Sequence, residues 1–277
     1  MATRDEYGRE VDARMDEDER RDRVRITSAQ GLIDEARANI VRRLESAGEF
    51  ETVYLEGLRR EIEDVLGDMD QGVSGLIGVS GDEISDQVDT DLTDTLRIAS
   101  IATDFPMIDR ALITSYVEFA STTFKGVTTE ASAKIMQEVA LSAVGAKTRN
   151  EAIGEIGRNL SDRSIFRTIS QRAETILSTE QARLRAAARQ HRMDALSERD
   201  LGLMKYWQTR GDTNVRSTHV QAGLDYSEER AIALDARYRI GGFWTLYPRA
   251  WSLPAKESVR CRCYSLIYVP DDLFSDT

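Results

Sequence analysis

Cysteine and proline are scarce in this chain, which has two cysteines and four prolines among 277 residues. Because Cys261 and Cys263 are separated by a single residue, they exclude a disulfide framework, and we expect an intracellular origin. No uncharged apolar run approaches the roughly 18 residues that cross a bilayer, so we expect no membrane partner. The charge-rich segment 1–23 is unlike a secretory signal peptide.

Basic residues are in the minority, with 37 Lys and Arg against 48 Asp and Glu and a formal net charge of −11. This balance argues against broad, non-specific binding of nucleic acid through its phosphates. The excess of acid is confined to residues 1–200, which hold 27 basic and 39 acidic side chains, whereas residues 201–277 hold 10 and 9. The later segment also contains all three tryptophans and 11 of the 19 aromatic residues. We therefore predict a domain boundary near residue 200.

The first 200 residues show helical patterning. Residues 1–22 mix charges with few apolar side chains, which predicts a solvated, charged tail or a frayed helix. Over residues 23–200, apolar residues return every three or four positions, which predicts an elongated α-helical region. Five glycines fall within 67–81, and we expect a loop or hinge there.

Two further signals mark helix ends in this region. Pro106 is expected to open a helix that ends near Gly126, and Thr148 and Glu151 have the spacing of a capping box. A long helix is predicted from Asp162 to about Ser197. The fold class expected for the whole chain is mainly α, with a long helical N-terminal body followed by a small α+β domain over 201–277.

The C-terminal segment contains the residues that carry chemistry. Strand formers at 203–209 and 259–269 predict two strands, and Asp212 is expected to cap a short helix over 213–222 that stops at Gly223. Side chains alternate along a strand, so the two cysteine sulfurs should point to one face. If the strands pair and the helix lies across them, His219 would meet both thiols.

This group of side chains allows several interpretations. His219, Cys261 and Cys263, with Asp212 as a further candidate, would form a metal site, and zinc takes ligands of these types. Alternatively, the thiols are buried as small apolar groups and His219 bonds to backbone or to Glu257. A Cys–His hydrolase is the catalytic alternative, although no oxyanion loop accompanies it. A disulfide across a strand between positions i and i+2 would be strained.

The remaining residues also have two interpretations. Asp212 and Arg216 form either an anion clamp or a helix cap with an intrahelical ion pair. The tryptophans are expected in the core of the small domain. Its arginines would supply a local basic patch for DNA, which requires basic and aromatic residues to be interleaved. These arginines are Arg237, Arg239, Arg249, Arg260 and Arg262.

The order of these residues resembles the phage Mu F-like family of minor head and head-morphogenesis proteins. The resemblance rests on Trp207, Asp212, Arg216, His219 and Gly223, then Tyr247-Pro248, then Pro254-Ala255, Glu257 and Cys261-Arg262-Cys263. The helix segment 172–180, with its Thr179-Glu180 pair, is also similar to that family. The family usually has Asn before the first cysteine, where this chain has Arg260.

The resemblance covers about residues 165–270 and implies a structural role without enzymatic activity. Such proteins occupy the head interior or the portal vertex of a tailed phage, made in the bacterial cytoplasm, in several copies per particle. The implied partners are the portal protein and the major capsid or scaffold proteins, with packaged DNA at the basic patch. Head morphogenesis and DNA packaging or delivery would be the function. The alternatives are a metal- or thiol-dependent enzyme domain and a protein ejected with the DNA.

Overall fold

The computed structural model describes residues 3–47, 50, 54–105, 110–158, 164–199 and 201–274. The fold is mainly α, with a long N-terminal helical region followed by a small region with a few strands, as the sequence predicts. The chain divides into two compact units. The helical unit comprises residues 23–79 and 117–177, and the mixed unit comprises residues 1–22, 80–116 and 178–277.

Long helices account for most of the first 200 residues. These are α1 (Arg4–Ser46), α2 (Leu55–Ile98), α3 (Arg110–Ala143), the short α4 (Arg149–Ile153) with its continuation η2 (Gly154–Arg158), and α5 (Ile165–Ser197). Helices α1, α2, α3 and α5 each contribute to both units. None of the helices in the described parts of the chain has an apolar stretch long enough to cross a membrane.

The loop or hinge expected at 67–81 is wrong, because α2 continues through all five glycines. The reason is an unbroken apolar stripe through the same segment, in which Met69, Val73 and Ile77 are buried. Burial of such a stripe outweighs the roughly 1 kcal/mol that each glycine costs a helix. The helix end expected near Gly126 is wrong for the same reason, since α3 runs on with Val127 and Ala131 buried.

The charged tail expected over 1–22 is also wrong for the described residues from Arg4 onward, which form the first turns of α1. Tyr7, Val11 and Met15 recur every four residues and are buried. The Tyr7 hydroxyl donates a hydrogen bond of 2.8 Å to the carbonyl oxygen of Ile267. The sequence hides this stripe because the surrounding positions are almost all charged.

The remaining helix signals can be compared where the structure describes them. The capping box at Thr148 and Glu151 is confirmed, with both reciprocal bonds present. The last long helix is confirmed as α5, whereas its expected start at Asp162 and the Pro106 signal lie outside the described residues.

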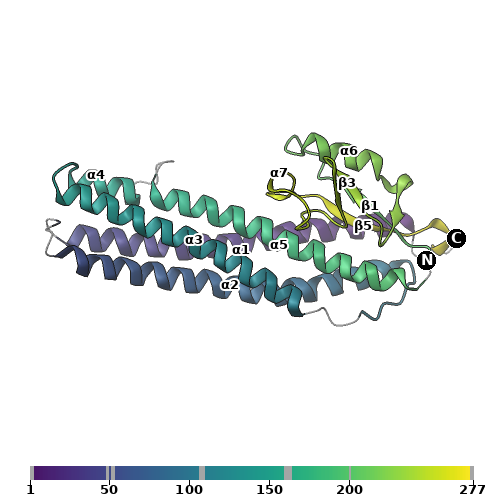
Figure 1. The fold of residues 1–277 in the computed structure, drawn as a ribbon. Helices are drawn as coiled ribbons and strands as arrows, with labels where there is room; N and C mark the ends of the chain where they lie inside the picture. Colours follow the sequence, from purple (N-terminus) through teal and green to yellow (C-terminus); the bar gives the residue numbers. More distant parts are fainter. Residues whose placement is uncertain are drawn as a thin grey trace. The chain divides into compact units, whose positions relative to one another are not determined.

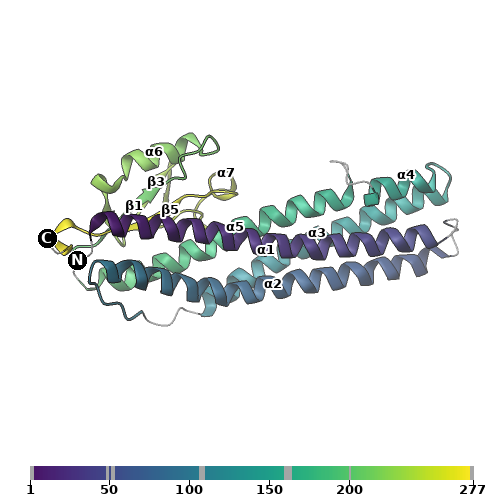
Figure 2. The same cartoon turned by 180° about the vertical axis from the view of Figure 1, so that it is seen from behind.

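Within the helical unit, stretches of α1, α2, α3 and α5 run side by side (Figures 1 and 2). Their facing stripes supply a buried aliphatic core that includes Ile33, Ile62, Ile77, Ile135 and Ile169. The Arg149 guanidinium closes one end of this unit by donating to the carbonyl oxygen of Leu44 at 2.6 Å. The unit is therefore a helical bundle of the kind that amphipathic stripes produce.

The mixed unit is built on a three-stranded antiparallel sheet in the order β2–β1–β5. The strands are β1 (Met204–Gln208), β2 (Ile232–Ala233) and β5 (Tyr264–Tyr268), and Trp207 lies opposite Ser265. The predicted pairing of the two C-terminal strands is confirmed. A two-stranded hairpin, β3 (Tyr238–Ile240) and β4 (Phe243–Thr245), turns at Gly241 and Gly242, which have φ of 55° and 90°.

Short helices complete the mixed unit: η3 (Glu228–Arg230), α6 (Ser217–Asp225), α7 (Ala255–Ser258) and η4 (Asp271–Leu273). The division into units does not follow the boundary expected near residue 200. Residues 201–277 share one unit with the start of α1, the end of α2 and the end of α5. The Tyr7 bond to β5 is one physical reason, because it ties the first helix to an edge strand of the sheet.

Candidate metal centre

His219, Cys261 and Cys263 meet in the interior of the mixed unit, and we call these three residues the His–Cys cluster. The Nδ1 atom of His219 lies 3.4 Å from the Cys263 sulfur and 3.5 Å from the Cys261 sulfur. All three side chains are at most 3% exposed. The predicted meeting of the imidazole with both thiols is confirmed, and both cysteines are free.

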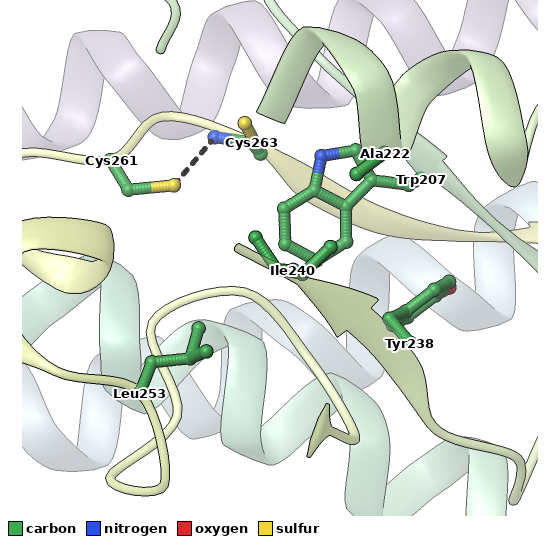
Figure 3. Close-up of a cluster of buried hydrophobic side chains, with 7 residues drawn as sticks. All are labelled: Trp207, Ala222, Tyr238, Ile240, Leu253, Cys261 and Cys263. Atoms are coloured by element: carbon green, nitrogen blue, oxygen red, sulfur yellow. Dashed lines mark hydrogen bonds between the residues drawn. The ribbon is translucent and has the colours of Figure 1, made fainter. Parts of the chain in front are cut away.

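Short local structures bring these side chains together. His219 lies in the first turn of α6, while the two cysteines lie in the segment between α7 and β5. The backbone N–H of Cys263 points back to the Cys261 sulfur at 3.4 Å, so the segment curls around that sulfur (Figure 3). This curl, rather than strand alternation, turns both sulfurs toward His219, because β5 begins only at Tyr264.

Trp207 fixes the imidazole from one side. Its ring meets that of His219 edge to face, with centroids 5.6 Å apart and an angle of 86° between the planes. Trp207 is buried in a hydrophobic cluster with Tyr238, Ile240 and both cysteines (Figure 3). Edge-to-face packing of this kind restricts the ring plane of the histidine.

Glu257 contacts the ring nitrogen of His219 that does not face the sulfurs. Its Oε2 atom lies 3.2 Å from Nε2 of His219 and accepts a hydrogen bond of 2.8 Å from the Thr218 hydroxyl. Glu257 is itself buried. The alternative in which His219 bonds to Glu257 is thus confirmed, and it coexists with the contacts to sulfur because the two use different ring nitrogens.

The geometry suits a metal ion. With zinc bonds of about 2.3 Å to sulfur and 2.0–2.1 Å to nitrogen, tetrahedral ligands lie about 3.6 Å apart, close to the two N–S distances here. The three ligand atoms all lie within 4.8 Å of one another, and no further His, Cys, Asp or Glu of the described residues joins this group. The cluster could therefore hold a metal ion with three protein ligands.

The electrostatics favour one thiolate within the pair. A hydrogen bond from the Cys263 thiol holds the pKa of Cys261 well below its usual range despite burial. The pKa of Cys263 is raised, first by this shared proton and then by burial. A thiolate is the form of cysteine that binds metals, so one of the two cysteines is already in the form that binds an ion.

Asp212 and Arg216 are not partners, which corrects the expected intrahelical ion pair. Asp212 is exposed, pairs with Arg262, and accepts a 3.0 Å hydrogen bond from the Asn214 N–H. This local turn delays the helix, so α6 begins at Ser217 with Arg216 at its N-cap, instead of at 213. Asp212 therefore lies outside the His–Cys cluster and is not among its candidate ligands.

Arg216 and Gly223 nevertheless support the cluster. Arg216 donates a hydrogen bond of 2.5 Å to the carbonyl oxygen of Val259, in the segment that leads to the cysteines. Gly223 lies inside α6, which continues past the expected stop to Asp225. A Cβ at Gly223 would lie 3.3 Å from the Thr209 methyl carbon and 3.8 Å from the Trp207 carbonyl oxygen, so its small size lets α6 approach β1 closely.

Two groups of aromatic and basic residues depart from expectation. Trp207 is buried, whereas Trp244 and Trp251 are 56% and 52% exposed, so the prediction of three core tryptophans is wrong for two of them. Arg249 is buried and donates to the carbonyl oxygen of Cys263, which removes it from the expected basic patch. Arg239 remains on the surface, with its guanidinium over the ring of Trp244.

Two residues of α5 also contribute: Thr179, which belongs to the resemblance, and Arg183, which the sequence did not mark. Thr179 of α5 accepts a hydrogen bond of 3.1 Å from the Arg260 N–H, one residue before Cys261. Arg183, one turn later, donates to the carbonyl oxygen of Arg249 at 2.7 Å. The helical spacing of Thr179 and Arg183 was the available signal, since both fall on one face of α5.

Comparison of the chain with protein-family models, with curated proteins and with solved structures finds no match.

Proposed function

We propose that this chain is a structural protein of a tailed-phage head, a minor head protein that associates with the portal vertex and acts in head morphogenesis. The observation that carries this proposal is the spatial convergence of seven of the residues on which the resemblance rests, with Asp212 outside the group. Trp207, Arg216, His219, Gly223, Glu257, Cys261 and Cys263 span 57 positions of the sequence, and all of them lie in or directly support one buried centre. A pattern that arose by chance would not be expected to converge in this way.

The upstream part of the resemblance supports the same proposal. Thr179 lies more than 20 residues before β1, yet its hydroxyl contacts the segment that carries the cysteines. The helix and the small α+β region therefore act as one structural element within the mixed unit, consistent with a protein built for assembly.

Burial favours a structural over a catalytic role for the centre. The His–Cys cluster and Glu257 are all at least 95% buried, so the thiolate does not face a solvent-filled cleft. A thiol or metal hydrolase needs a nucleophile or an open ligand position that faces a cleft. The centre instead links α6 to the segment before β5.

We infer that zinc occupies the His–Cys cluster and strengthens the link between α6 and the segment before β5. The supporting observations are the two N–S distances, the lowered pKa of Cys261 and the exclusion of solvent. Metal analysis of the full chain, purified without chelators, should give one zinc per chain, and the C261S/C263S variant should give none. Zinc-free wild-type protein with both thiols titratable would contradict this part of the proposal.

The head role is tested by co-expressing the full chain with the portal protein of the same phage genome. We expect the two to co-purify, and we expect the C261S/C263S variant to co-purify less because the mixed unit is loosened. A variant at an exposed position of the helical unit, Arg60→Ala, serves as the matched control and should behave like wild type. Failure of the wild-type chain to associate with portal, capsid or scaffold protein would contradict the proposal.

A further inference from the structure

The carboxylate of Glu257 lies on the far side of the His219 ring from the two sulfurs. Nδ1 faces Cys261 and Cys263, whereas Nε2 faces Oε2 of Glu257 at 3.2 Å. An imidazole binds a metal through a nitrogen that carries no proton, and its other nitrogen then carries the proton. A carboxylate beside Nε2 can accept that proton's hydrogen bond and leave the Nδ1 lone pair directed at the sulfurs.

Glu257 is held in this position from two further directions. The Thr218 hydroxyl donates to the same Oε2 atom at 2.8 Å. On the other oxygen, the turn of the β3–β4 hairpin approaches so closely that a Cβ at Gly241 would lie 2.7 Å from Oε1. Gly241 also has a left-handed φ of 55°, so this position favours glycine for both reasons. The carboxylate is thus enclosed and has little freedom to turn away from the imidazole.

The ring plane and the tautomer of His219 are set by different neighbours. Trp207 restricts the plane through its edge-to-face contact, but this contact does not distinguish the two ring nitrogens. The two nitrogens are distinguished by their partners, because Nε2 faces Glu257 whereas Nδ1 faces the two sulfurs. Of these partners, the Glu257 carboxylate is the one placed to hold a proton on Nε2.

We propose that Glu257 is a positioning residue for the metal centre: it fixes His219 as the Nε2–H tautomer and thereby sets the affinity of the His–Cys cluster for zinc. This inference rests on the zinc site proposed above. Partners of this kind behind a metal-bound histidine typically change metal affinity by 10- to 100-fold when they are removed.

The test uses the full chain, wild type and variants, with zinc ion as the probe in competition with a chromophoric chelator. Glu257→Ala should bind zinc about 10- to 100-fold more weakly than wild type. Glu257→Gln retains an oxygen that can accept the Nε2–H bond, so it should lose less affinity than Glu257→Ala. If Glu257→Ala does not fold, Glu257→Asp, which withdraws the carboxylate by one methylene, replaces it with the same expected direction.

A spectroscopic measurement separates positioning from a loss of stability. The chain has two histidines, so ¹⁵N spectra of the imidazoles resolve His219, with His191 as the internal reference. Zinc-loaded wild type and Glu257→Gln should both show His219 protonated at Nε2 and bound through Nδ1. Glu257→Ala should show a mixture of tautomers before zinc is added.

The outcomes distinguish this inference from the zinc site itself. Wild-type protein that binds no zinc, or a C261S/C263S variant that binds it as tightly, would overturn the zinc site and this inference with it. Wild-type zinc affinity and an unchanged His219 spectrum in folded Glu257→Ala would overturn the role of Glu257 and leave the zinc site standing.

Discussion

At the scale of single residues, Lys205 has an unusual environment for a basic side chain. It lies in the central strand β1 and is fully buried, and its Nζ donates to the Gln190 side-chain oxygen and to the Leu246 carbonyl oxygen, both at 2.9 Å. Burial lowers the pKa of Lys205 to about 8. The amine is charged at neutral pH, and burying this charge makes the folded state less stable.

This environment predicts a dependence of stability on pH. Between about pH 8 and pH 10.4 the unfolded chain keeps the Lys205 proton that the folded chain has lost, so the free energy of unfolding should rise with pH in this window. The contribution is roughly 3 kcal/mol at most. Denaturant unfolding of wild type and Lys205→Met at several pH values would measure this contribution. The free energy of unfolding of wild type should rise with pH relative to that of the variant, which lacks the amine. A difference that is flat from pH 8 to 10.4 would contradict the assignment.

The residues of the centre were only partly predictable from the sequence. The approach of His219 to both sulfurs was predicted correctly from strand pairing, but the cysteines lie before β5, and the curl of that segment turns their sulfurs toward the ring. The position of Asp212 did not follow, because its carboxylate bonds to Asn214 and Arg262, and sequence spacing alone does not reveal those partners. The exposure of Trp244 was not predictable either, because composition does not show which residues lie on the outer face of a short hairpin.

At the scale of secondary-structure elements, α2 contains glycines that packing does not require. A Cβ at Gly75 would meet no atom within 4 Å, and Gly75 is exposed. At Gly72, in contrast, a Cβ would lie 3.1 Å from a methyl carbon of Leu32. The glycine-rich part of α2 therefore has a low intrinsic helix propensity, and burial of its apolar stripe stabilises it as a helix.

Gly75→Ala should stabilise the helical unit by about 0.5–1 kcal/mol, because alanine is the better helix former and meets no obstacle. Gly72→Ala is the matched control in the same helix and should gain less or lose stability, because Leu32 must move. Thermal unfolding followed by circular dichroism compares the two. Equal effects of both substitutions would show that the packing described for Gly72 does not hold.

The first turns of α1 illustrate why element boundaries were missed. Three buried residues among many charges form too weak a pattern to outweigh composition, so the segment resembles a solvated tail. Its helix is stabilised by tertiary contacts, since Tyr7 bonds to Ile267 and the Tyr264 hydroxyl donates to the Met15 carbonyl oxygen at 3.4 Å. The α2 glycines lie in a helix for the same reason, because burial of the apolar stripe outweighs their low helix propensity.

Met15→Ala tests this packing. Met15 is buried, and its truncation should cost about 2–5 kcal/mol of stability. Arg9→Ala changes an exposed position of the same helix and should alter stability by less than about 0.5 kcal/mol. Chemical denaturation of both variants provides the comparison. If Met15→Ala unfolds at the same denaturant concentration as wild type, residues 4–22 do not contribute to the mixed unit as described.

At the scale of the whole molecule, charge and burial are unevenly distributed. The acidic excess lies in residues 1–200, and an acidic surface repels the phosphates of DNA at close range. The chemistry-bearing side chains lie buried in the mixed unit, where they hold the fold together. Both features are consistent with the head role proposed above.

The location of this chain in virions purified from a phage that encodes it tests the proposed role most directly. Quantitative mass spectrometry of the particles, combined with a reconstruction of the portal vertex, gives its copy number and position. We predict several copies per particle, placed at the portal vertex or on the adjoining inner surface of the head. Purified, infectious virions that lack the chain while it accumulates free in the infected cell would contradict the account.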